Sequence, residues 1–243
     1  MALPLPLPFQ GNEALGLVRE NQPIAQFLVG DTRNLIYLIL DWESRQAALV
    51  DNHPDLAEVT AALAKYGFSL KWILQTHTHW DHVGGLPSLF EEFPDARLLL
   101  HEKEIWRLQK SKDRALAMKA VDRSRCIRDQ ERLHLGQTDL LCHHVPGHSA
   151  GSISFEVSPP QGGSRFLLTG DTLFIQDCGR TDLETGSVAE MFASLQRYKT
   201  LDPSLIVLPG HQYRPPVAAV LESEWKTSPP FQVASVEELE RLP

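Results

Sequence analysis

The sequence predicts an α/β protein in which two β-sheets pack between helices. In both halves of the chain, short β-branched and aliphatic runs are followed by segments with helical spacing of apolar residues. The 243 residues are enough for one large domain with a sizeable core. Hydrophobic residues make up 42% and charged residues 22%, as in ordinary globular proteins, so neither disorder nor a fibrous class is indicated.

The first half of the chain opens with a predicted hairpin. Residues 34–41 (NLIYLILD) and 46–51 (QAALVD) are strand-like runs separated by the polar turn WESR. A helix is expected over 55–66, because Pro54 lies near its start and Gly67 follows its end. The next expected elements are a strand at 72–75, a helix at 84–93, a strand at 97–100 and a helix at 102–110.

The second half again runs from strands to a helix, without an obvious repeat at the level of residues. The expected elements are strands at 139–144, 152–157 and 166–168, a helix at 188–198 and a last strand at 205–208. Segments 159–164 and 226–230 are rich in Pro, Gly and Ser and are predicted connections. These patterns divide the chain into an N-terminal extension (1–25), a main domain (26–226) and a short C-terminal tail (227–243).

Several features of the chain predict a cytoplasmic protein. The N-terminal MALPLPLPF is apolar, but it lacks a basic region and contains prolines, so it does not resemble a signal peptide. No segment approaches the ~18 to 20 continuous apolar residues of a membrane span. The three cysteines Cys126, Cys142 and Cys178 are an odd number without a close pair, which indicates reduced thiols.

The charge balance limits the partners. There are 31 acidic and 23 basic side chains, giving a net charge of −8 at pH 7, and no run of Lys or Arg offsets it. This surface would repel a phosphate backbone, so nucleic acid is not an expected partner. We expect a small-molecule substrate and no membrane partner, and the sequence leaves a homo-oligomer open.

The strongest local signal is THTHWDH, from Thr76 to His82. It places three imidazoles and one carboxylate within a few residues, directly after a predicted strand. Helical spacing cannot bring all four side chains to one point, but a loop at the end of a strand can. Imidazole is a preferred ligand of zinc and iron, and a carboxylate adds a harder, negatively charged ligand. The motif predicts a metal site.

Three later ligand residues share one context, the end of a predicted strand beside a glycine. They are His148 in HVPGHSAGS, Asp171 in LLTGDTLF and His211 in VLPGHQY. Any one of these, taken alone, is more often an ordinary glycine turn with a polar neighbour. Together with THTHWDH they predict one site with seven ligands: His77, His79, Asp81, His82, His148, Asp171 and His211.

The order and spacing of these seven residues resemble the metallo-β-lactamase superfamily, and the resemblance spans most of the chain from Asn34 onward. It implies a four-layer αββα sandwich with the site at the edge between the two sheets. It also implies that one metal ion binds His77, His79 and His148 and that a second binds Asp81, His82 and His211. Asp171 would bridge the two ions.

The resemblance implies hydrolytic chemistry for this site. A metal-bridging hydroxide, formed near neutral pH because two cations stabilise its charge, would attack a carbonyl carbon. Asp81 would also orient this nucleophile, so Asp81 and Asp171 are the candidate catalytic residues. We expect two divalent ions, zinc first, although the same ligands also accept iron or manganese.

Further residues indicate the branch of the superfamily. The commonest class B β-lactamases have a cysteine at the position of Asp171, so antibiotic hydrolysis is not expected. In contrast, NLIYLILDWESRQAALVDN followed by THTHWDHVGG is similar to the N-terminal half of glyoxalase II, the hydroxyacylglutathione hydrolase. This similarity implies hydrolysis of a glutathione thioester, such as S-D-lactoylglutathione, or of another small thioester.

Arg180 in CGRTD and Tyr213 in HQY resemble residues that contact glutathione in glyoxalase II relatives and in glutathione persulfide dioxygenases. A guanidinium and a phenol suit an anionic tripeptide. The structural alternatives are that Arg180 pairs with Asp182 and that Tyr213 packs beside the metal loop.

The resemblance also offers a rival function. The tail SPPFQVASVEELERL resembles the end of the persulfide dioxygenases, in which a single Fe(II) would be held by the residues at the positions of His77, His148 and Asp171. Three ligands leave coordination positions open for oxygen and substrate. A lactonase or a non-enzymatic metal-binding protein is a further alternative, and the presence of all seven ligands favours an enzyme.

Overall fold

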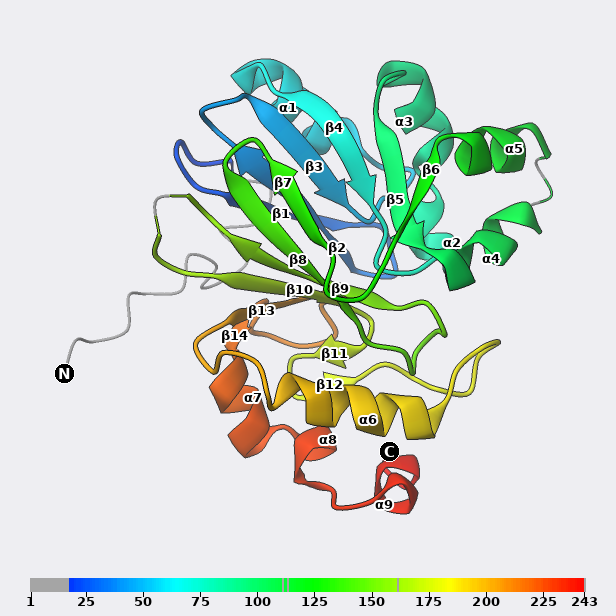
Figure 1. Ribbon diagram of the computed structural model, residues 1–243, viewed down its shortest axis with the longest axis vertical. Coiled ribbons are helices and arrows are strands. Elements are labelled where there is room, and N and C mark those ends of the chain that lie inside the picture. Colours follow the sequence, from blue (N-terminus) through cyan, green and yellow to red (C-terminus); the bar gives the residue numbers. More distant parts are fainter. Residues whose placement is uncertain (1–17, 111, 113, 161, 243) are drawn as a thin grey trace.

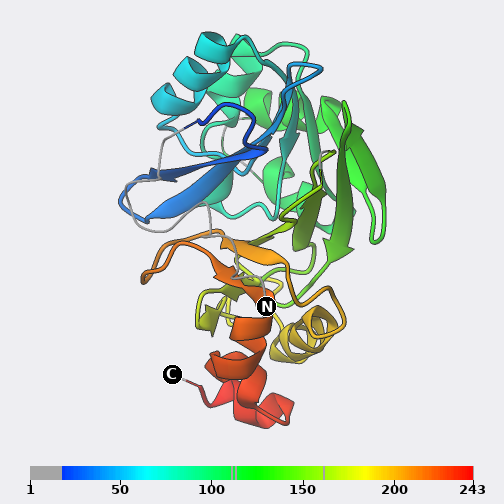
Figure 2. The same ribbon diagram turned by 90° about the vertical axis from the view of Figure 1, so that its left-hand side faces the viewer.

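The computed structural model describes residues 18–110, 112, 114–160 and 162–242. They form two six-stranded sheets that lie face to face, with helices on both outer faces (Figures 1 and 2). The predicted αββα sandwich is therefore confirmed. A small two-stranded sheet lies beside the second large sheet.

The first sheet contains the predicted hairpin. β2 and β3 pair antiparallel from Asp41 and Gln46 outward, while β3 to β6 pair in parallel. β2 is buried along its whole length, because it lies in the middle of the sandwich and packs on both faces. In sheet order the strands are β1 (Ile24–Val29), β2 (Asn34–Asp41), β3 (Gln46–Val50), β4 (Ser69–Leu74), β5 (Arg97–His101) and β6 (Ser124–Ile127).

The helices on the first sheet follow the predicted order with one difference. Gly67 ends α1 in the left-handed conformation, at φ 67°, as its place after the apolar pattern predicted. The prediction of a single helix over 102–110 is wrong. The segment begins as a 3-10 turn capped by His101 and becomes α-helical only after that turn. The elements are α1 (Ala57–Tyr66), α2 (Trp80–Val83), α3 (Leu86–Glu92), η2 (Glu102–Glu104), α4 (Ile105–Gln109) and α5 (Arg114–Asp122).

The second sheet is mainly antiparallel, with one parallel pair, β10 and β13. Its strands, in sheet order, are β14 (Ala219–Val220), β13 (Ile206–Pro209), β10 (Phe166–Gly170), β9 (Ile153–Ser158), β8 (Thr138–His144) and β7 (Arg132–Leu135). The small sheet is β11 (Leu173–Phe174) with β12 (Asp177–Cys178). The outer helices are α6 (Val188–Tyr198), α7 (Leu221–Thr227), α8 (Pro229–Gln232) and α9 (Val236–Glu240).

Three apolar clusters fill the spaces between the four layers. Successive side chains of β2 point to opposite faces of the first sheet. Tyr37 and Ile39 therefore lie in the cluster between the two sheets, and Leu38 lies in the cluster under the first set of helices. The third cluster lies between the second sheet and α6 and includes Phe231 and Leu239. The described part of the predicted tail therefore packs on the domain through α8 and α9. Of the predicted N-terminal extension, residues 1–17 lie outside the described residues.

Two further features concern the cysteines and the lengths of the helices. The cysteines Cys126, Cys142 and Cys178 are all free. Within the described part of the chain, none of the helices is both long enough and apolar enough to cross a lipid bilayer.

Asp41, at the end of β2, is a buried carboxylate that joins the two sheets. Its Oδ1 accepts hydrogen bonds from the backbone N and the hydroxyl of Ser44, at 2.9 and 2.7 Å. Its Oδ2 accepts from Gln137 N and Thr138 Oγ1, at 2.9 and 3.1 Å, in the β7–β8 turn of the other sheet. Burial raises the pKa of Asp41, but these hydrogen bonds outweigh it and hold the pKa below its usual value.

We predict that Asp41→Asn lowers the free energy of unfolding by about 1 to 3 kcal/mol at neutral pH, because the amide has one acceptor oxygen and cannot accept from both Ser44 and the Gln137–Thr138 pair. A carboxyl with a lowered pKa stabilises the fold above its unfolded-state pKa, and this contribution is lost as the pH falls through the folded-state value. Urea unfolding from pH 7 into the acid range should therefore show the difference from wild type shrinking below about pH 4. A constant difference, or an equal loss in the exposed control Asp95→Asn, would contradict this.

Candidate metal centre

The seven predicted ligands meet where strands of both sheets end. His77 and His79 lie in the loop after β4, and Asp81 and His82 lie on α2. The remaining ligands follow strands of the second sheet: His148 comes after β8, Asp171 after β10 and His211 after β13. Because β10 and β13 are parallel, their carboxyl ends lie at the same edge. The structure thus brings all seven side chains into one region.

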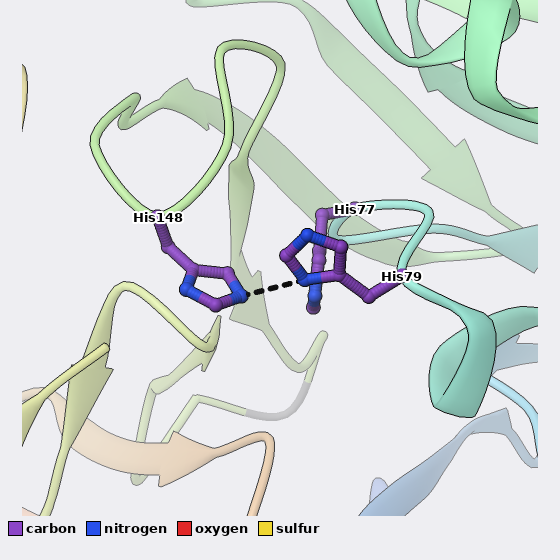
Figure 3. Close-up of side chains that lie close together, drawn as sticks. All are labelled: His77, His79 and His148. Carbon is purple, nitrogen blue, oxygen red and sulfur yellow. Dashed lines mark hydrogen bonds between the residues drawn. The ribbon is translucent and has the colours of Figure 1, made fainter. Parts of the chain in front are cut away.

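The first group of ligands is His77, His79 and His148, and Figure 3 shows the three rings turned toward one another. One ring nitrogen of each lies within 4.8 Å of the others. Nε2 of His148 is 2.8 Å from Nδ1 of His79, and the two rings are nearly perpendicular. His77 and His148 are buried. Three converging nitrogens at this spacing fit one metal ion.

The second group is Asp81, His82 and His211, and its ligand atoms also lie within 4.8 Å of one another. Nε2 of His82 is 3.1 Å from Nε2 of His211. Oδ2 of Asp81 is 3.4 Å from Nε2 of His211 and 3.8 Å from Nε2 of His82. This group adds a carboxylate to two imidazoles, so it carries the negative charge that a cation neutralises.

Asp171 lies between the two groups. Its Oδ2 is 3.2 Å from Nε2 of His211 and 3.7 Å from Nε2 of His148, while its Oδ1 is 3.5 Å from Nε2 of His82. Burial opposes ionisation, but His82 and His211 hold the pKa of Asp171 well below its usual value. Glycine is required beside it, because a Cβ at Gly210 would lie 2.2 Å from Asp171 Oδ1.

The hydrogen bonds on the outer side of the rings test whether the site fits cations. Nδ1 of His148 donates to the Arg180 carbonyl at 2.8 Å, and Nδ1 of His211 donates to the Thr32 carbonyl at 2.9 Å. In a neutral ring, each Nε2 then carries a lone pair that points into the site. Lone pairs that face other acceptors at about 3 Å repel one another, and a cation between them removes that repulsion.

Two buried atoms at the centre support the same conclusion. Nε2 of His77 and Oδ1 of Asp171 have no hydrogen-bond partner among the described residues. Buried polar atoms are rarely left unpaired, so these two atoms are oriented for a ligand. The donor set of imidazoles and carboxylates therefore fits divalent cations, and the chain supplies enough ligands for two.

The protonation of the ligands differs between the two groups. Burial lowers the pKa of His77 well below its usual value and that of His79 to about 3, so both rings are neutral and ready to act as ligands. Burial also lowers the pKa of His211, but the hydrogen bond and charge of Asp171 outweigh it and raise the value to about 9. A cation in the second group therefore competes with a proton for the imidazole, and binding there releases it.

Asp51 supports the site and was missed in the sequence. It follows β3 at φ 56°, a conformation that is rare for residues other than glycine. Its Oδ2 accepts from Nδ1 of His82 at 3.0 Å and from the hydroxyl of Thr76 at 2.7 Å. The Thr76 hydroxyl in turn accepts from Nδ1 of His77 at 3.0 Å. One carboxylate thus orients rings of both groups. An acidic residue at the end of a strand was the available signal.

Glu104 is a second supporting residue, and no local sequence pattern distinguishes it. Its side chain is buried. Oε2 accepts from the backbone N and the hydroxyl of Thr78, at 2.8 and 2.6 Å. Oε1 accepts from Ser149 Oγ at 2.7 Å and from Gly151 N at 3.0 Å. Glu104 therefore ties the loop of His77 and His79 to the loop of His148.

A cavity of about 560 Å³ opens above the ligands, and both predicted substrate-binding residues line it. The guanidinium of Arg180 pairs with the exposed carboxylate of Asp182 at 2.6 and 2.7 Å. The ring of Tyr213 is 59% exposed and stacks on the ring of His211 at 5.1 Å. Burial, and then the charge of Asp171, raises the pKa of Tyr213 to about 12, so its hydroxyl keeps its proton at neutral pH. Each residue thus makes its expected local contact and still faces the cavity.

Comparison with known proteins identifies relatives of the chain. The family described as the metallo-beta-lactamase superfamily matches residues 33–211. The hydroxyacylglutathione hydrolase of Synechococcus sp. is 38% identical over 192 residues, which cover 74% of this chain and 65% of that protein. PksB of Bacillus subtilis, a probable polyketide biosynthesis zinc-dependent hydrolase, is 33% identical over 181 residues, covering 74% of this chain and 73% of that protein.

A solved structure shows the same fold. The crystal structure of ETHE1 from Myxococcus xanthus superimposes with a TM-score of 0.73 at 24% identity, covering 90% of this chain and 92% of that one. Because the chain spans 65% of the length of the Synechococcus hydrolase, the activity of the longer protein does not transfer to it directly.

We predict that Asp171→Ala reduces the total metal content more than alanine at any other ligand. Both groups lose a ligand atom, and the repulsion between the two ions is less neutralised. Metal per chain, measured by elemental analysis after equilibration with zinc, should fall below that of Asp81→Ala, which removes a ligand from one group only. Two ions retained at full occupancy in Asp171→Ala would show that this residue does not bridge.

We also predict that Asp51→Asn weakens zinc binding by about 10- to 100-fold. The neutral amide cannot replace the charged carboxylate that accepts a hydrogen bond from Nδ1 of His82 and orients its ring. Zinc affinity is measured by competition with a chromophoric chelator. Asp55→Asn, an exposed change on the same connection, is the control. Equal affinities in all three proteins would remove Asp51 from the supporting role.

Proposed function

The chain belongs to the metallo-β-lactamase superfamily, and we propose that it is a metal-dependent hydrolase that cleaves a glutathione-type or other small thioester. One observation carries this proposal: two groups of ligands lie side by side and share Asp171, with imidazole lone pairs directed inward. Such an arrangement suits a pair of ions in contact with one reacting molecule. The relatives named as hydroxyacylglutathione hydrolase and as zinc-dependent hydrolase support the same reaction type.

In this proposal the first ion is held by His77, His79 and His148 and the second by Asp81, His82 and His211, with Asp171 between them. When bound, the cations lower the pKa of a water molecule and polarise the carbonyl of the thioester. We propose zinc, which the Bacillus relative's name supports, although iron or manganese would accept the same ligands.

We propose that Asp81 orients the attacking water. Burial raises its pKa, but the hydrogen bond with His211 outweighs burial and lowers the value to about 2, so the carboxylate is ionised at neutral pH. The amide of Asn34 donates to the Asp81 carbonyl and to its Oδ2, at 3.2 and 3.3 Å, which fixes the direction of the side chain. A fixed, ionised carboxylate can accept a hydrogen bond from the attacking water. The proton of the water then points toward Asp81, and a lone pair of its oxygen can face the carbonyl carbon.

Arg180 and Tyr213 are proposed to hold the thiol part of the substrate. Arg180 now pairs with Asp182, but exposed pairs of this kind contribute little to stability, so a carboxylate of glutathione can replace Asp182 at small cost. The phenol of Tyr213 keeps its proton and can donate a hydrogen bond to a peptide carbonyl. Both groups would act away from the reacting carbon.

The rival is a mononuclear Fe(II) dioxygenase that acts on glutathione persulfide. It would use only His77, His148 and Asp171. Four further ligands, His79, Asp81, His82 and His211, face the same region, and this favours two ions and hydrolysis. A lactonase or a non-enzymatic metal-binding protein would fit the fold as well. We place the hydrolase in the cytoplasm, which the three free thiols support.

We predict that the protein releases free thiol from S-D-lactoylglutathione without consuming oxygen, because hydrolysis needs only water as co-substrate. Thiol release is followed with a chromogenic disulfide, and oxygen is followed with an electrode in the same cell. The Asp171→Ala variant is the control for metal-dependent turnover. Oxygen uptake with glutathione persulfide, together with no thioester cleavage, would replace the hydrolase with its rival.

We predict that Arg180→Ala raises KM for a glutathione thioester by about ten- to a hundredfold with little change in kcat, because its contact exists in both ground and transition states. Tyr213→Phe removes one neutral hydrogen bond and should have a smaller effect. Arg125→Ala, exposed on β6, is the control. The comparison substrate is a short thioester without the tripeptide. Equal losses on both substrates, or a loss confined to kcat, would show that Arg180 and Tyr213 do not bind glutathione.

A further inference from the structure

A second cavity adjoins the metal centre and has no role in the site described so far. It has a volume of about 380 Å³ and lies between α2, α3, α4 and α5. Most of its wall is apolar, formed by Val83, Leu86, Trp106, Leu108, Ala117 and Ala120. A concave apolar space of this size is typical of a small-molecule site.

The second cavity adjoins the cavity above the metal ligands. His79, Trp80, Arg107 and Glu184 line both. The indole of Trp80 is 73% exposed, which is unusual for so large an apolar side chain, and it stands where the two cavities meet. A molecule whose reacting carbon lies at the metal centre can therefore extend past His79 into apolar surroundings.

A hydrogen bond and an exposed ion pair connect the loop between β12 and α6 to residues at this junction. Arg107 donates to the Glu184 carbonyl at 3.1 Å, and Lys110 Nζ is 2.9 Å from Glu184 Oε1. The guanidinium of Arg107 also lies over the Trp106 ring, 4.6 Å from its centroid. Nε of Arg107 is buried and has no hydrogen-bond partner among the described residues. The side chains at the junction are thus fixed by contacts between α4 and this loop.

We propose that the second cavity binds the acyl chain of the substrate, so that the preferred thioester carries an apolar acyl group longer than lactoyl. This inference rests on the proposed function. Arg180 and Tyr213, which are proposed to hold the thiol part, line the metal-site cavity beside His148 and His211, and neither lines the second cavity. The acyl part is the remaining half of a thioester, and the second cavity is the adjoining apolar space, on the side of His79 and Trp80.

The preference should appear as a dependence on chain length. Each methylene group that leaves water for an apolar wall favours binding by roughly three- to fourfold. We therefore expect kcat/KM for N-acetylcysteamine thioesters to rise by about that factor per methylene from acetyl through butanoyl and hexanoyl to octanoyl. These thioesters lack the tripeptide, so the series measures the acyl part alone.

A pair of variants on α5 locates the effect. Ala117 is buried in the cavity wall, and Ala117→Phe should fill the space and reduce the ratio of octanoyl to acetyl kcat/KM at least tenfold. Met118 is the next residue and is 68% exposed outside the wall, so Met118→Phe should leave the ratio unchanged. A ratio that is equally high in both variants would overturn the proposal.

A measurement on the unaltered protein covers the case in which Ala117→Phe does not fold. Octanamide, a neutral probe, should compete with the octanoyl thioester and bind in calorimetry, whereas acetamide should do neither. A flat chain-length series with normal acetyl turnover and no octanamide binding would overturn the acyl cavity and leave the hydrolase intact. Octanamide binding without hydrolysis of any thioester would overturn the proposed function and support the cavity as an apolar binding site.

Discussion

The rest of the structure depends on one constraint, the convergence of ionisable side chains on Asp171 in a buried space. The nitrogens of His148 and His211 lie within 3.7 Å of its carboxylate, and Nε2 of His82 lies 3.5 Å from it. The lone pairs of neutral imidazole nitrogens repel carboxylate oxygens at these distances unless cations or protons lie between them. The four-layer fold supplies the rigidity that keeps them together, because every ligand follows a strand or lies on a helix packed against one.

The support for this arrangement comes from buried carboxylates that bind no substrate. Asp51 orients His82 directly and His77 through Thr76, so the two groups of ligands share one anchor. Glu104 joins the loops before α2 and after β8 with four hydrogen bonds. Since each lone pair of these carboxylates has a donor, their burial is compensated, and the ligands are positioned before any cation binds.

The sequence predicted the sandwich and brought all seven ligands to notice, because THTHWDH and the glycine-flanked His148, Asp171 and His211 are local patterns. It did not reveal Asp51 and Glu104 as supports, since their hydrogen-bond partners lie far along the chain. Asp51 was marked only by its place at the end of a strand, and nothing in the local pattern distinguishes Glu104 from ordinary polar residues. The helix expected over 102–110 is broken by the turn that places Glu104 inward. β6 and β7 were missed because each mixes exposed polar and buried residues over only four positions, whereas the equally short β13 is apolar and buried throughout. Contacts between distant parts of the chain determine these hydrogen bonds, the break in the helix and the short strands, so the local periodicity of the sequence does not predict them.

In the proposed function, substrate recognition would rest on two unlike surfaces beside the predicted ligands, a polar one with Arg180 and Tyr213 and an apolar one in the second cavity. The use of both surfaces in substrate binding would depend on where the ions lie. Anomalous diffraction at the zinc and iron edges, from crystals grown without added metal, tests this most directly. The account predicts two peaks on either side of Asp171, one within reach of His77, His79 and His148 and one within reach of Asp81, His82 and His211. A single iron peak bound only by His77, His148 and Asp171 would contradict it.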